Sequence, residues 1–438
     1  MLGLLLSVIL LNFRPFEPVI LNGEQIPEFD HVSLNQLFCA AFRDGNWEVV
    51  PFQIDEQDVD GSFFMPDDGL LDANDELVLD PQDGGGLALV SHFGDFAGAD
   101  AYPRVQIKAT DPLSGDMVYF YLFRSAAPPP LSPIERVQYD GVLDEITCDH
   151  YSLGFHAAHR RWDRLQVWEG SQFSADLLDR EKMRVSGSMF SIPYVIDETN
   201  FEFLGLSMVT GPLRVLRQVR GRVTVFTFEF DLPIEKHYYN GLVTTPDGSL
   251  SYDPSMGVET IRISVDWSPD SLGTSFNNAY LQDILIDGQP DIFGPVVFTP
   301  EDLSSLWSEF TRDNWSLVQI GNYQGIASDN RLYYYDDLLG GTGDGTSDTG
   351  DGVSYGDTGI IFDGLNTGEH KLSSKLLVDA TGSLDGPTAK DQFLAPIITE
   401  LVSQNATTGL GELYDLWRQE NPENPPALIT ILDMISTQ

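Results

Sequence analysis

Cationic residues are scarce in this chain. Lys and Arg together number 24 among 438 residues, whereas Asp and Glu number 67, so the formal net charge at pH 7 is -43. Nucleic-acid phosphates and anionic membrane surfaces both bind to cationic protein surface. The composition therefore excludes nucleic acid and anionic membranes as partners.

Cysteine is also scarce, since Cys39 and Cys148 are the only residues of this type. Two cysteines are too few for a disulfide scaffold, although they are compatible with one bridge between the first two parts of the chain. Their spacing alone does not establish that they meet.

Long apolar runs are lacking too. The run from Leu2 to Leu11 is shorter than the about 20 residues that a membrane-spanning helix needs, so no transmembrane span is expected. It has only part of the pattern of a signal peptide, because no Lys or Arg precedes it and no small-residue cleavage site follows closely. If the run is retained rather than cleaved, we expect it to be buried as a strand in its own domain or in a neighbouring subunit of a homo-oligomer.

Familiar catalytic signatures are missing as well. The sequence has no nucleophile elbow, zinc-protease helix, dinucleotide fingerprint or phosphate-binding loop. We therefore assign no catalytic residue and no organic cofactor. Cys148, His150, His156 and His159 are the densest group of transition-metal ligand types and give a weaker alternative, a metalloenzyme.

The pattern of apolar residues predicts a mainly β protein made of several sandwich-like domains, with a few short helices towards the C-terminus. Alternation with period two is clearest at 105–109 and 117–123, on either side of a turn sequence at 111–116. Helices are expected at 301–311, after a capping sequence, and around 393–402, where apolar residues recur at helical spacing.

A chain of this length is expected to divide into two or three domains. The prolines at 128–130 mark a linker, because they cannot continue a helix or donate to a sheet. The predicted parts are an apolar N-terminal segment (1–17), a β domain with Asp-rich loops (18–125), a Pro-rich linker (126–133), a large β domain (134–300) and a mixed C-terminal part (301–438).

Acidic residues in the first predicted β domain have the spacing of a calcium-binding loop. Glu56, Asp58 and Asp60 stand at alternate positions, Gly61 is sixth and Asp67 is twelfth, as in the loop of an EF-hand. The sequence departs from that pattern, because Glu56 replaces an Asp, Asp67 replaces the bidentate Glu, and a strand rather than a helix is expected just before the loop. The loop is nearer in type to the Asp-rich loops of dockerin-like or thrombospondin-type repeats.

A second acidic set follows at once, in which Asp72, Asn74 and Glu76 repeat the alternate spacing. We interpret both sets as calcium loops. The alternative interpretation is a solvated acidic turn region.

The residues from Pro51 to Glu56 and from Asp72 to Val78 read PFQIDE and DANDELV. This block resembles a segment of uncharacterised secreted and surface proteins of prokaryotes. The resemblance implies an extracellular or cell-surface location, and it supplies no catalytic residue because that family has no assigned reaction.

A third acidic set lies in the Gly- and Asp-rich stretch at 340–357, where Asp344, Asp348 and Asp351 are candidate calcium ligands. The alternation of Gly and Asp resembles calcium-binding β-roll repeats, although the nine-residue period is not kept. A flexible surface loop is the alternative.

Two classes of function remain. The first is an extracellular, calcium-stabilised structural protein that self-assembles as a filament, sheath or surface layer through its N-terminal apolar segment. The second is a secreted carbohydrate-binding protein, or a lyase or hydrolase, in which Arg214, Arg217, Arg220 and Arg222 bind an acidic polysaccharide beside tyrosines of the middle β domain. Pairing of these arginines with the protein's own carboxylates is the simpler interpretation.

The charge of -43 predicts a dependence of stability on cations, because self-repulsion must be relieved by diffuse salt or by discrete divalent sites. We expect a chelator to lower the melting temperature at low salt and added calcium to restore it. A thermal melt series checks this. Indifference to the chelator would refute the calcium sites, and equal rescue by sodium chloride would indicate diffuse screening instead.

Overall fold

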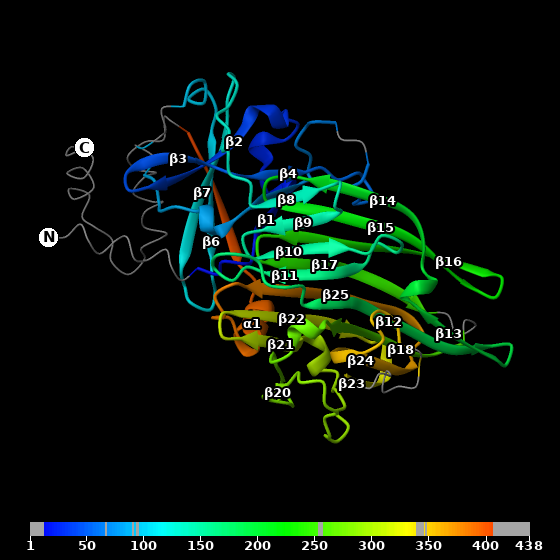
Figure 1. The fold of residues 1–438 in the computed structure, drawn as a ribbon. Helices are drawn as coiled ribbons and strands as arrows, with labels where there is room; N and C mark the ends of the chain where they lie inside the picture. Colours follow the sequence, from blue (N-terminus) through cyan, green and yellow to red (C-terminus); the bar gives the residue numbers. More distant parts are fainter. Residues whose placement is uncertain are drawn as a thin grey trace. The chain divides into compact units, whose positions relative to one another are not determined.

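The computed structural model describes residues 13–65, 68–89, 92, 96–252, 257–338, 346 and 348–405. The chain divides into two compact units, which Figure 1 draws in sequence colours. Unit 1 comprises residues 1–135 and 396–438, and unit 2 comprises residues 136–395. The predicted mainly β, multi-domain architecture is confirmed, since the described residues form several antiparallel sheets and a single α-helix.

The described residues of unit 1 form two antiparallel sheets. The first has the order β1-β5-β4, with strands Val19–Asn22, Glu76–Leu79 and Gln53–Asp55. The second has the order β26-β6-β7-β2-β3, with strands Ile398–Gln404, Arg104–Thr110, Met117–Arg124, Leu37–Arg43 and Asn46–Val50. The strands expected at 105–109 and 117–123 are thus present and pair across the expected turn.

The last described strand, β26, returns to unit 1 and pairs with β6 along its whole length. Arg104 fixes this pairing from a fully buried position. Its Nε donates to Oε1 of Gln404 over 2.7 Å, and its terminal nitrogens donate to the carbonyl oxygens of Leu89 and His92. The guanidinium also lies 4.9 Å from the ring centre of Tyr121, so a cation–π contact supplements these hydrogen bonds.

In the described part of unit 2 there are three antiparallel sheets. A four-stranded sheet has the order β11-β10-β9-β8, with strands Trp162–Val167, Tyr151–Phe155, Glu145–Cys148 and Val137–Asp140. A five-stranded sheet has the order β13-β12-β18-β24-β23, with strands Ile192–Asp197, Leu178–Met189, Val258–Trp267, Ser354–Leu365 and Ala327–Asp337. A nine-stranded sheet has the order β14-β15-β16-β17-β25-β22-β21-β19-β20, with strands Glu202–Thr210, Arg214–Val225, Phe228–Tyr239, Leu242–Tyr252, Gly368–Asp379, Trp315–Gln324, Leu306–Arg312, Ser275–Asn278 and Ile284–Leu285.

The five- and nine-stranded sheets of unit 2 bury a common core. Trp267 of β18 packs against Phe310 of β21 with ring centres 4.5 Å apart, and Leu317 of β22 belongs to the same buried cluster. Strands before and after residue 300 therefore lie in the same sheets. The chain divides at 135/136 and 395/396, which differs from the expected boundary at 300, because strand pairing joins residues that are far apart in sequence.

The helix expected at 301–311 does not form. Asp302–Ser304 is one 3-10 turn, and Leu306–Arg312 is strand β21, which pairs with β19 and β22. Pairing on both edges satisfies the backbone here and overrides the local helical pattern.

The C-terminal helix is only partly as expected. Helix α1 (Gly386–Leu394) ends just before Pro396, and residues 398–404 form β26 instead of continuing it. Proline disfavours helical geometry at the residue before it, and the edge of β6 offers a partner to the extended chain. In the part of the chain that the structure describes, no helix is long and apolar enough to cross a membrane. The residues at 413–417, which have apolar side chains at helical spacing, and the apolar run at 427–435 lie outside the described residues.

Close packing of β24 against β18 gives a test of the unit 2 fold. A Cβ atom added at Gly359 would lie 1.9 Å from the carbonyl oxygen of Ile263, so Gly359→Ala forces the backbone apart. We expect the variant to lose at least about 2 kcal/mol of unfolding free energy in urea denaturation. Gly248→Ala is the matched control, because its nearest neighbour lies at 3.7 Å, and it should be neutral or slightly stabilising.

Candidate functional site

The first predicted calcium loop is closed by hydrogen bonds of its own. Oδ1 of Asp58 accepts from the backbone N–H groups of Asp60 and Ser62, each over 2.9 Å. Oε1 of Glu56 accepts from the N–H of Gly69 over 2.8 Å. These carboxylates therefore act as turn-forming acceptors, while Asp67 lies outside the described residues.

The second predicted loop is organised around Asp75, which is buried and was not among the expected ligands. Its two oxygens accept from the N–H groups of Gln57 and Asp72, and Asn74 donates to the carbonyl oxygens of Gln57 and Asp58. Glu76 lies in β5.

Of the expected ligands in these two loops, Asp72 is the one that joins a compact ligand group within the described residues. Its partners there are Asp30 and His31. His31 Nδ1 lies 2.9 Å from Oδ1 of Asp72. Calcium binding by these loops stays a prediction.

The third predicted set meets two acids that spacing could not identify. Ligand atoms of Asp351, Asp179 and Asp266 lie within 4.8 Å of one another. Asp348 lies beside them and accepts from Nζ of Lys182 over 2.6 Å, while Asp344 lies outside the described residues.

Lys182 supplies a positive charge to this acidic cluster. Its fully buried Nζ lies 2.5 Å from Oδ2 of Asp266 and 3.9 Å from Oδ2 of Asp357. Burial alone would lower the pKa of Lys182, but Asp357 and Asp266 outweigh it and hold the pKa above its ordinary value. The lysine therefore stays charged, and a calcium ion here remains a prediction.

The histidines proposed as metal ligands together with Cys148 make local contacts. His156 and His159 stack with ring centres 3.9 Å apart, and the backbone N–H groups of Ala158 and Arg161 donate to their Nδ1 atoms. Cys39 and Cys148 are free, buried thiols, and burial raises the pKa of each to about 12. Neither is a reactive thiolate at neutral pH.

The arginines proposed for polysaccharide binding are mostly engaged within the protein. Arg214 is fully buried and donates to the hydroxyl of Tyr239, which is itself buried. Arg222 pairs with Asp231 and Glu229. The simpler interpretation, pairing with the protein's own groups, fits these contacts.

The hollows of unit 2 meet at a group of side chains that the sequence did not single out. We call Arg161, Trp162, Glu181 and Lys236 the junction cluster. Arg161 precedes β11, Trp162 begins it, Glu181 lies on β12 and Lys236 lies on β16. Each of the four lines at least two of the three hollows described below.

Ion pairs bind the junction cluster together. Nζ of Lys236 donates to Oε1 of Glu181 over 2.8 Å, and a guanidinium nitrogen of Arg161 lies 3.3 Å from the other carboxylate oxygen. Nζ of Lys236 also lies 3.5 Å from the ring centre of Trp162. Burial alone would raise the pKa of Glu181, but Lys236 and Arg161 outweigh it and lower the pKa to about 2.

Positive charge is in surplus around this cluster. A small hollow behind it is lined by Arg160, Arg161, Arg217 and Lys236, with Glu181 as the one acid among its lining residues. Asp144 pairs with Arg160 and Arg217 at 3.0 and 3.1 Å. Burial lowers the pKa of Lys236, and Glu181 offsets this only in part while Arg161 and Arg217 add to it. The site therefore favours an anion, in contrast to the charge of the whole chain.

A large apolar cavity extends from Arg161 between the five-stranded and nine-stranded sheets of unit 2. Its volume is about 290 Å³, and among the described residues that line it Arg161 alone has a formal charge at neutral pH. The other walls come from Met183 and Val185 of β12, Ile234 of β16 and further apolar residues out to the ends of the β12–β13 and β15–β16 hairpins. Nε of Arg161 is buried and has no hydrogen-bond partner among the described residues.

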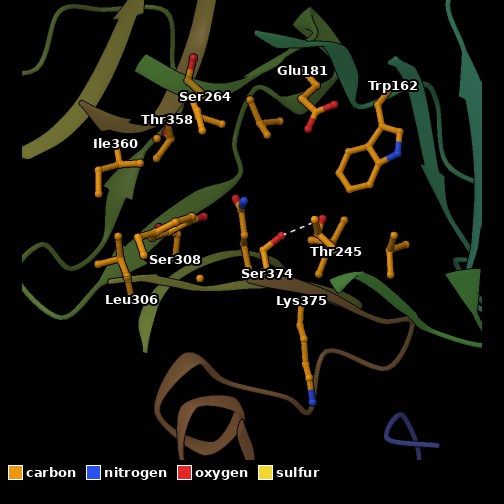
Figure 2. A pocket seen from close by; sticks show the side chains of 18 of the residues that line it. Trp162, Glu181, Thr245, Ser264, Leu306, Ser308, Thr358, Ile360, Ser374 and Lys375 are labelled. Carbon is orange, nitrogen blue, oxygen red and sulfur yellow. Dashed lines mark hydrogen bonds between the residues drawn. The ribbon is translucent and has the colours of Figure 1, made fainter. Parts of the chain in front are cut away.

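A smaller cavity of about 60 Å³, lined by both polar and apolar side chains, lies on the other side of the junction cluster. Figure 2 shows Glu181 and Trp162 on one side of it and Thr245, Ser374 and Ser308 on another. The hydroxyl of Ser374 donates to that of Thr245 over 3.1 Å, whereas Lys375 points away from the cavity. Small hydroxyl side chains on facing strands leave this space open.

The junction cluster can bind and orient an anion, and its one carboxylate, Glu181, is unsuited to act as a general base at neutral pH. The pKa of Glu181 is about 2, so it stays ionised, and its oxygens are already paired with cations. A general base normally needs a pKa near the working pH. The arrangement therefore favours binding.

Comparisons with known proteins assign no family. No family model and no curated protein matches the chain. The chain is similar to the crystal structure of an alpha-mannosidase from Enterococcus faecalis V583, with 9% identity over 90% of this chain and 45% of that one. It is also similar to a glycosyl hydrolase family 38 protein from Enterococcus faecalis, with 8% identity over 90% and 46%. The TM-score is 0.45 in both cases, and the chain spans less than half of either structure, so these likenesses assign no activity.

Glu181 gives a test of the junction cluster. We expect Glu181→Gln to lose about 3–5 kcal/mol of unfolding free energy at pH 7, because Lys236 and Arg161 lose their buried partner. The folded pKa is depressed, so this contribution is present above the unfolded pKa of about 4.5 and is lost as the pH falls towards 2.

The measurement is urea denaturation of both proteins between pH 7 and pH 2.5. The gap between wild type and variant should narrow at acid pH. Glu229→Gln is the control, because this exposed partner of Arg222 should contribute no more than about 1 kcal/mol. A gap that does not change with pH would contradict the assignment.

Proposed function

We propose that unit 2 binds a single-chain amphiphile with an anionic head, such as a medium-chain carboxylic acid. The observation that carries this proposal is the apolar cavity of about 290 Å³ that ends at Arg161, the one charged side chain among the described residues of its wall. The cavity wall is apolar along its length and cationic at the inner end. This distribution matches the alkyl chain and the carboxylate of an alkyl carboxylate.

The apolar part of the cavity sets the size of the ligand. An apolar cavity of about 150 Å³ accepts benzene, which has six carbons, so 290 Å³ suits a chain of roughly twelve. A ligand that binds the folded protein and not the unfolded chain would stabilise unit 2.

The cationic end selects the head group. A carboxylate beside Arg161 accepts from its buried Nε, and the surplus of guanidinium and ammonium groups behind it adds attraction at low dielectric. His370 lies in the same cavity wall, with Nε2 engaged by the carbonyl oxygen of Asn366. An alcohol of equal length would gain the apolar contacts but not the charge.

The functions inferred from the sequence stay predictions. Self-assembly was assigned to residues 2–11, which lie outside the described residues. Extracellular location, calcium stabilisation and polysaccharide binding are untested by the contacts described above. Amphiphile binding is compatible with a secreted or surface protein and does not require catalysis.

Titration calorimetry of the full-length protein with saturated carboxylates of eight to sixteen carbons tests the proposal. We expect the affinity to rise by roughly tenfold for every two methylenes and to level off near twelve carbons, where the cavity is filled. Arg161→Gln should weaken dodecanoate binding by about tenfold or more and leave dodecanol binding unchanged.

Retained dodecanol binding also shows that the Arg161→Gln variant is folded. Arg331→Gln is the matched control, because this exposed arginine of unit 2 pairs with Asp363 on the sheet surface. Absence of binding to every acid in the series would overturn the proposal. If Arg161→Gln weakens dodecanoate and dodecanol binding equally, the head group does not bind at Arg161.

A further inference from the structure

The apolar cavity runs out to the tips of two neighbouring hairpins. Met189 at the end of β12 and Val225 at the end of β15 line the cavity, and the residues just beyond them are Phe190 and Phe226. Figure 1 shows both hairpins projecting at the same side of unit 2. The ring centres of Phe190 and Phe228 lie 6.4 Å apart, so the two tips are in contact range.

These tips expose large apolar side chains to solvent. Phe190 is 79% exposed, Phe226 47% and Phe228 46%, and Ile192 and Val195 on β13 are also more than half exposed. We call these five residues the tip patch. Contiguous exposed apolar surface of this kind marks a binding surface rather than ordinary solvent-facing residues.

Each tip holds its phenylalanine in an unfavourable backbone conformation. Phe190 and Ser191 form the two-residue turn between paired Met189 and Ile192, with φ of 54° and 67°. Phe226 has φ of 55° in the corresponding turn of β15–β16. Asn and Gly are the usual residues at such positions, and an aromatic residue there is strained. Strain of this kind, repeated on two adjacent turns, points to a functional requirement for the ring.

The residues that form the two tips carry no charge of their own. Residues 185–196 and 223–228 contain no Asp, Glu, Lys or Arg. Charged side chains flank them, since Arg222 pairs with Glu229 and Asp231 at the base of the second hairpin and Glu259 accepts from the hydroxyl of Ser188. The protein has a net charge of -43, but its tip residues are uncharged and apolar. Such tips suit a partner that has no net charge on its surface and an apolar interior below that surface.

We propose that the tip patch inserts into an electrically neutral lipid surface and that the amphiphile passes between this surface and the apolar cavity. The second half of this proposal rests on the proposed function. Aromatic rings are favoured at the boundary between lipid head groups and acyl chains. The uncharged tips incur no cost of charge desolvation on insertion, whereas the acidic remainder of the protein is repelled by anionic lipid.

Co-sedimentation with phosphatidylcholine vesicles tests this surface. The full-length protein should bind, should bind equally at low and high salt, and should bind less well when phosphatidylglycerol is added. The double variant Phe190→Asn with Phe226→Asn should lose tenfold or more in vesicle affinity. Its melting temperature should be equal or higher, because Asn accepts positive φ more readily than Phe.

Ile292→Asn is the matched control, since this side chain is 99% exposed in unit 2 but lies outside the tip patch. It should bind vesicles as the wild type does. Dodecanoate binding is measured separately in the absence of vesicles. Acid binding without vesicle binding overturns only the lipid-surface proposal, whereas vesicle binding without acid binding overturns the amphiphile function and the transfer, leaving the surface contact in place.

Two further outcomes would overturn the lipid surface as the partner. In the first, the wild-type protein does not bind neutral vesicles and sediments as an oligomer, whereas the double variant is a monomer. The tip patch would then be an interface between copies of this chain. The other is a loss of vesicle binding in Ile292→Asn equal to that in the double variant, which would indicate adsorption without a specific surface.

Discussion

Burial of its few cations is the constraint on which this structure depends. Lys and Arg are normally exposed, yet Lys182, Arg104, Arg214 and Arg262 are fully buried here. Removing such charges from water is costly unless carboxylates and hydrogen bonds compensate. The protein has acids in excess for this purpose, so the cations become fixed points around which strands of the sheets are positioned. Lys182 links β12, β18 and β24 in this way through Asp266 and Asp357.

The same constraint explains why the candidate site is found inside unit 2. Most acids are on the surface or in turns, but the buried cations at the junction cluster and behind it outnumber their acidic neighbours. A chain with a net charge of -43 thus contains an interior that attracts anions. The apolar cavity adjoins this interior at Arg161, and the combination of the two environments, rather than either alone, supports an amphiphilic ligand.

The apolar cavity reaches the protein surface at the tips of the β12–β13 and β15–β16 hairpins. Alternation along β12 and β15 directs one set of side chains into the cavity, while the turn residues beyond them stay exposed. A turn with Phe at positive φ is less stable than one with Asn or Gly. Its presence at both tips agrees with the general finding that local conflicts between sequence and structure gather at functional sites.

The sequence by itself decided the β class and the strands around the turn at 111–116, because strand alternation is a local property. It also identified acidic loops, and Asp348 and Asp351 do lie beside other carboxylates. Tertiary structure alone decided the rest. Residues 306–312 and 398–404 became strands because neighbouring edges needed partners, and Arg161, Glu181 and Lys236 met because three distant strands fold together. No spacing rule in a sequence with 67 acids could have selected Glu181.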